Sequence, residues 1–79
     1  MPRLLREAAA RLAAGSDAAP EIAEVERGLG QAGFAPIDYV SLAREATLEP
    51  LARAEAPCRL FAAAWLGRTR LIDNWPVLS

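Results

Sequence analysis

The side chains in this sequence that could do chemistry are nine arginines, ten carboxylates and one cysteine, and there is no histidine. Without histidine the chain cannot form a His-assisted serine or cysteine nucleophile, and it lacks the usual zinc ligand sets. The single cysteine, Cys58, cannot form an intramolecular disulfide, and its strand position predicts a buried small side chain. We therefore predict no catalytic residue, no cofactor-binding residue and no metal site in these 79 residues.

The arginines remain as candidates for binding, because a guanidinium can hold a phosphate or a carboxylate in a bidentate way. They are spread along the whole chain, and the formal net charge is −1. A chain with this charge balance has no global attraction for nucleic acid or anionic lipid. We expect neither a nucleic acid nor a membrane as partner, and an arginine-based nucleic-acid binder is the weakest hypothesis.

One group of residues in the last third of the chain combines aromatic area with charge: Phe61, Trp65, Arg70 and Ile72. These residues lie in two apolar runs joined by Gly67-Arg68, which fits a two-residue type II′ hairpin turn. If Leu66 faces Thr69, Trp65 faces Arg70, and the four side chains share one face of the hairpin. The other face carries mainly leucines and alanines, so neither face is plainly polar.

Two helices are expected before the hairpin. An apolar stripe predicts the first over residues 2–14, with Gly15 ending it. The second follows a cap at Ser16 or Asp17 and stops at Gly33, which suits a left-handed conformation.

A third strand is predicted from the alternating run 37–42, which should lie beside one arm of the hairpin. Residues 47–51 predict a single helical turn, because proline is tolerated only near a helix start. The fold class is therefore α+β, a single domain over residues 1–79 with a small three-stranded antiparallel sheet and helices packed on one face. The predicted core is Leu4, Leu12, Ile22, Val25, Leu29, Val40, Leu42, Leu60, Leu66 and Leu71.

Three blocks of sequence carry a resemblance to a known family. Gly33-Phe34 with residues 37–40 resembles its Gly-Phe … Asp-Tyr strand, and residues 46–50 resemble its Ala-x-Thr-Leu segment. Residues 60–74 closely resemble its closing hairpin, and the most specific piece is Thr-Arg-Leu-Ile-Asp-Asn at 69–74 after Leu-Gly. The family is the pantothenate synthetases, or pantoate–β-alanine ligases, and the part resembled is their C-terminal domain.

The resemblance implies an enzyme that condenses pantoate with β-alanine, using ATP and Mg²⁺ through an enzyme-bound pantoyl-adenylate, and a homodimer of the full-length chain. A cytoplasmic location is expected from the residues, because there is one cysteine and no apolar run long enough to span a bilayer. In this family the chemistry belongs to an N-terminal nucleotidyltransferase domain with a His-x-Gly-His motif and a later Ser-Ser-Arg-Asn loop. Neither motif occurs in this sequence. The resemblance therefore places the chain just after that loop, with no catalytic or ATP-binding residue, and a fragment of this kind should be inactive by itself.

The family's C-terminal domain is a hinged lid over the adenylate site, and such closure excludes water from a hydrolysable intermediate. In this interpretation Phe61, Trp65, Arg70 and Ile72 form the lid face, and its partner is the N-terminal catalytic domain. Two other interpretations stay open. The aromatic residues could complete the core against the helices, or the chain could be a stand-alone interaction module that dimerises through its hairpin.

Overall fold

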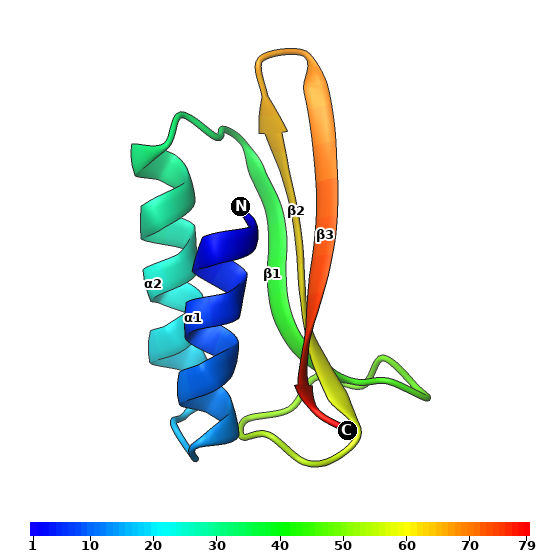
Figure 1. The fold of residues 1–79 in the computed structure, drawn as a ribbon. Coiled ribbons are helices and arrows are strands. Elements are labelled where there is room, and N and C mark those ends of the chain that lie inside the picture. Colours follow the sequence, from blue (N-terminus) through cyan, green and yellow to red (C-terminus); the bar gives the residue numbers. More distant parts are fainter.

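Two helices pack on one face of a three-stranded antiparallel sheet in the computed structural model, which describes all residues 1–79 (Figure 1). The strand order is β1-β2-β3, so β2 is central and each neighbour in the sheet is also a neighbour in the chain. The predicted α+β fold class and single sheet are confirmed. The elements are α1 (Pro2–Ala13), α2 (Ala18–Gln31), β1 (Ile37–Arg44), β2 (Cys58–Leu66) and β3 (Thr69–Leu78).

The hairpin of β2 and β3 has the predicted register. Leu66 pairs with Thr69, Trp65 with Arg70 and Leu60 with Trp75. Gly67 has φ 61°, a left-handed conformation that favours glycine and suits a tight turn between twisted strands. A turn of this type fixes the pairing of every residue behind it, because a slip of one position would exchange the two faces.

Each helix begins and ends where small or turn-forming residues allow it. Gly15 and Gly33 follow α1 and α2 with φ 109° and 94°, as expected of left-handed helix stops. Asp17 occupies the N-cap position of α2, but its side chain accepts a hydrogen bond from Arg53 Nε at 2.7 Å and makes no cap bond. Asp17 therefore stands at the start of α2 without making the side-chain hydrogen bond that usually accompanies this position.

The helices are also joined by one short ion pair. Arg11 of α1 donates from Nε to Glu21 Oε1 of α2 at 2.6 Å. This hydrogen bond is the main cause that raises the pKa of the Arg11 guanidinium. Because the Arg11 side chain is about half exposed to water, the pair adds little to stability.

The core lies between the helices and the inner face of the sheet. The predicted core positions Leu12, Val25, Leu29, Val40, Leu42 and Leu60 are buried, and Leu4 and Ile22 pack against the cluster. Cys58 is also buried and free, as predicted. Leu5 and Phe34 belong to the core as well, although the core prediction did not include them.

Two core predictions are wrong. Leu66 is 45% exposed and Leu71 is 37% exposed. Both flank the tip of the hairpin, which extends beyond the ends of the two helices (Figure 1). Both leucines lie on the inner face of the sheet, as predicted, but no helix covers this part of the hairpin, so their side chains remain exposed to water.

The predicted helical turn over residues 47–51 is also wrong. Leu48 has φ 61°, outside the right-handed helical region. Residues 49–51 instead run beside the end of β1, where Glu49 O accepts from Arg44 N at 3.0 Å and Leu51 N donates to Leu42 O at 2.9 Å. Backbone groups of β1 that the sheet leaves free are satisfied by this return of the chain.

Candidate functional site

The sheet face that turns away from the helices is the candidate site, and we call it the open face. Because residues alternate along a strand, the buried inner positions of β2 put its other side chains on this face. Cross-strand partners from β1 and β3 extend it. The open face comprises Tyr39, Ser41 and Ala43 of β1, Arg59, Phe61, Ala63 and Trp65 of β2, and Arg70, Ile72 and Asn74 of β3.

The four residues predicted for a lid surface are brought together on the open face. Ile72 is 63% exposed, and Tyr39 beside them is 41% exposed. Phe61 and Trp65 are half-buried, and they lie outside the core cluster under the helices. The interpretation in which these aromatic residues complete the core against the helices is therefore wrong.

Asp38 joins Trp65 to Arg70. Its Oδ2 accepts a hydrogen bond from Arg70 Nε at 2.7 Å and one from Trp65 Nε1 at 3.3 Å. The register of β1 shifts between Ile37 and Tyr39, so Asp38 occupies a bulge. A bulge re-aims a side chain, and here it lets one carboxylate reach both other strands.

A second polar group lies at the other end of the open face. Arg59 Nε donates to Asn74 Oδ1 at 2.8 Å, and Arg59 Nη1 lies 3.6 Å from Glu45 Oε1. Asp73, on the inner face, accepts a hydrogen bond from the Asn74 backbone N at 2.8 Å. The apolar centre of the open face thus has an arginine with an acidic or amide partner at each end.

The shape of the open face suits a macromolecular contact. The three surface hollows of the molecule are lined by residues of the helices, their flanking turns and the segment at Leu51-Ala52, and no open-face residue lines any of them. No three His, Cys, Asp or Glu side chains gather as a metal ligand set. A face without a hollow, with an apolar centre and paired charges at its rim, resembles a protein interface.

Sequence reasoning placed Phe61, Trp65, Arg70 and Ile72 on one face of the hairpin, as the register confirms, but it did not add Asp38 and Tyr39 to that face. The alternation of residues 37–42 indicated a strand, and it gave no sign of the bulge. The predicted register did contain a signal for an acidic neighbour. It pairs the Trp65 indole N–H with the Arg70 guanidinium across the strands, and two partly buried donors side by side favour a shared acceptor.

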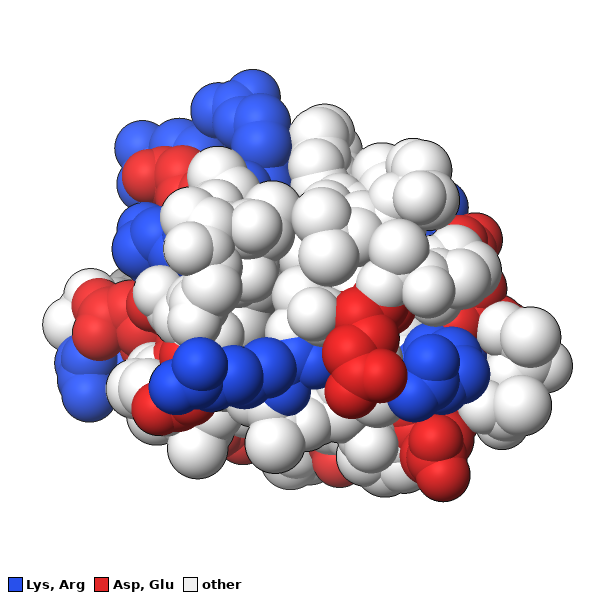
Figure 2. All heavy atoms as spheres, turned by 90° about the horizontal axis from the view of Figure 1, so that it is seen from below, with Lys and Arg blue, Asp and Glu red and all other residues white.

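Charges over the rest of the surface are mixed. Figure 2 shows basic and acidic side chains next to each other at the end of the molecule that carries the loop after β1. The ion pairs of the molecule include Arg53 with Asp17 and Arg44 with Glu55. Such a pattern has no extended basic field of the kind that binds a phosphate backbone. Neither helix is long and apolar enough to cross a membrane.

Comparison with known proteins gives the family. The model of the pantoate–β-alanine ligase family matches residues 1–76. The pantothenate synthetase of Rhizorhabdus wittichii is 53% identical over 77 residues, which make up 98% of this chain and 27% of that protein. That of Sphingopyxis alaskensis is 50% identical over 76 residues, again 27% of the relative.

A solved structure agrees with the sequence relatives. The crystal structure of pantothenate synthetase from Thermus thermophilus superposes with a TM-score of 0.81 and 28% identity, over 98% of this chain and 28% of that one. The chain spans about a quarter of the length of these relatives and corresponds to their C-terminal part. The chain therefore belongs to the pantoate–β-alanine ligase family.

Proposed function

We propose that this chain is the lid domain of a pantoate–β-alanine ligase. The whole enzyme would condense pantoate with β-alanine through a pantoyl-adenylate, using ATP and Mg²⁺, and would act as a homodimer in the cytoplasm. The partner of this chain would be the N-terminal catalytic domain of the same enzyme. In this role the chain excludes water and positions the other domain's site, and it performs no bond-making step itself.

The open face is the observation that carries the proposal. Neither helix packs on it (Figure 1), and Ile72 and Tyr39 remain exposed within it, although its two alanines, Ala43 and Ala63, are buried. A lid contact has to be reversible, so it needs apolar area to close and charge to stay soluble when open. The open face has both, with Arg70 held by Asp38 at one end and Arg59 by Asn74 at the other.

The residues of this chain do not fit a binding site for the metal or the nucleotide. No acidic cluster has the composition of a metal ligand set, and the sequence has no Gly-rich phosphate loop. In the proposed enzyme ATP and Mg²⁺ would therefore be held by the other domain. The isolated chain should show no saturable ATP binding by isothermal titration calorimetry, and micromolar binding would contradict this division of labour.

A chimeric enzyme tests the proposed function. The chain replaces the corresponding 77 residues of the Rhizorhabdus wittichii pantothenate synthetase, to which it is 53% identical. The chimera should form pantothenate from pantoate, β-alanine and ATP, whereas the same relative truncated before those residues should not. A folded chimera that forms no pantothenate and hydrolyses no ATP would refute the proposal.

A further inference from the structure

Leu48 combines two unfavourable features in one residue. It has φ 61°, a left-handed backbone conformation that glycine and asparagine adopt readily and leucine rarely does. Its side chain is also 63% exposed, as much as any large apolar residue in the molecule. An isolated chain would be better served by glycine or asparagine at this position, so the leucine needs an explanation outside these contacts.

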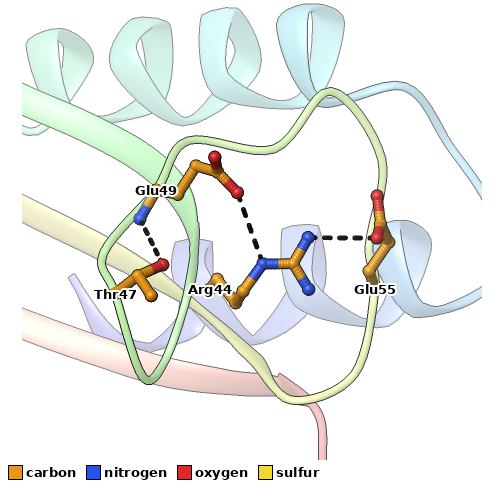
Figure 3. Close-up of polar contacts among 4 residues, drawn as sticks. All are labelled: Arg44, Thr47, Glu49 and Glu55. Carbon is orange, nitrogen blue, oxygen red and sulfur yellow. Dashed lines mark hydrogen bonds and ion pairs between the residues drawn. The ribbon is translucent and has the colours of Figure 1, made fainter.

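The backbone around Leu48 is held in place by several bonds at once. Leu48 N donates to Arg44 O at 2.8 Å, and Glu49 N donates to Thr47 Oγ1 at 3.2 Å. The Arg44 guanidinium reaches over the turn, with Nε 3.5 Å from Glu49 Oε1 and Nη2 3.1 Å from Glu55 Oε1 (Figure 3). We call residues 45–49 the braced turn.

Charged side chains contribute to the contacts that hold the braced turn. The hydrogen bond to Glu55, with a smaller contribution from Glu49, raises the pKa of the Arg44 guanidinium. Arg44 therefore ties two separate parts of the segment between β1 and β2 to the end of β1. A strained residue relaxes unless its surroundings determine its conformation, and these bonds hold Leu48 in the left-handed region.

The braced turn projects from the molecule on the side away from the helices (Figure 1). The open face is turned to the same side. Glu45 within the turn also lies 3.6 Å from Arg59, an open-face residue. The turn and the open face are thus adjacent, and one partner can contact both.

We propose that Leu48 is a docking anchor that packs on the catalytic domain of the ligase, with the braced turn presenting it at the edge of the open face. The identity of the partner rests on the proposed function. That partner corresponds to the part of the relatives that this chain does not span, about three-quarters of their length. Burial of a leucine side chain against that domain removes the exposed apolar area and compensates for the strained backbone.

Hydrogen exchange in the chimeric enzyme and in the isolated chain tests the anchor. Peptides covering the braced turn should exchange about tenfold or more slowly in the chimera, in the presence of ATP, Mg²⁺ and pantoate, than in the isolated chain. Leu48→Asn in the chimera should abolish this slowing, and Leu48→Met should retain it. Leu66→Asn is the matched control, since it removes another exposed leucine at the opposite end of the sheet and should leave the turn protected.

A melt of the isolated chain separates docking from folding. Leu48→Asn should leave the melting temperature unchanged or raise it by a few degrees, because asparagine tolerates the left-handed conformation. A clear fall would show that Leu48 supports the fold and would overturn the anchor. An active chimera, one that forms pantothenate, whose braced turn is not protected from exchange would also overturn the anchor. An inactive chimera whose turn is protected would instead overturn the ligase function and leave the anchor standing.

Discussion

At the residue scale, Asp38 decides how the open face is organised. Trp65 and Arg70 are cross-strand partners, and the contact expected between such a pair is stacking of the guanidinium on the indole. In the structure both donate to the same carboxylate oxygen. One residue from each of the three strands is therefore held in a single polar group.

Replacing Asp38 by alanine should free both donors. The loss in stability should be below about 1 kcal/mol, because the pair is partly exposed to water. The direct measurement is the exchange rate of the Trp65 indole N–H by NMR, which should rise while the melting temperature falls little. Asp73→Ala removes a carboxylate from the same hairpin without touching the indole, and equal exchange rates in the two variants would contradict the shared-acceptor role.

At the element scale, the fold depends on how closely α1 and α2 approach each other and the sheet. Gly28 of α2 faces α1, and a Cβ added there would lie 2.7 Å from Leu4 Cδ2. Gly30 lies two residues further along the same helix, and an added Cβ would meet no atom within 4 Å. Gly28 therefore lets the two helices approach closely, whereas Gly30 has no such role. In the sequence alone both residues only lower the helix propensity of this segment.

Alanine substitution should separate these two glycines. Gly30→Ala should raise the free energy of unfolding by about 0.5–1 kcal/mol, because alanine is the better helix former and nothing opposes its methyl group. Gly28→Ala should gain less or lose stability, because the Leu4 side chain has to move. The comparison is made by thermal melts of the two variants, and equal stabilisation would mean that the helices do not meet at Gly28.

Leucine substitutions test the position of the core in the same way. Leu60 is fully buried on the central strand, so Leu60→Ala should cost about 2–5 kcal/mol and threaten folding. Leu71→Ala should cost markedly less, because the side chain is 37% exposed near the hairpin tip. Urea unfolding of both variants gives the two values, and a larger loss for Leu71 would place the helices nearer the tip than the structure has them.

The difference between what could and could not be predicted has a physical origin. Pairings around Gly67 followed from local turn chemistry and alternation, and both helix stops followed from Gly15 and Gly33. The Asp38 bulge and the braced turn depend on contacts between distant segments, such as Arg70 with Asp38 and Arg44 with Glu55. No periodicity within one segment contains that information.

At the scale of the whole molecule, the fold has one covered and one uncovered sheet face. The helices pack on the inner face, and the two arginines of the open face are paired with Asn74 and Asp38. A domain built in this way has its own core and still offers a partly apolar surface, as the proposed lid role requires. This chain spans only 27% of the length of its relative from Rhizorhabdus wittichii, and the partner that we propose for the open face is the remaining part of such an enzyme.

The most direct measurement is the amount of AMP released per pantothenate formed by the chimeric enzyme carrying Trp65→Ala. Loss of the indole should weaken closure of the open face over the adenylate site, so water should consume part of the intermediate. We expect the ratio of AMP to pantothenate to rise above one, while a melt shows that the fold is largely intact. A ratio that stays at one together with a sharply lower melting temperature would contradict the account, because Trp65 would then serve the fold and the open face would have no lid role.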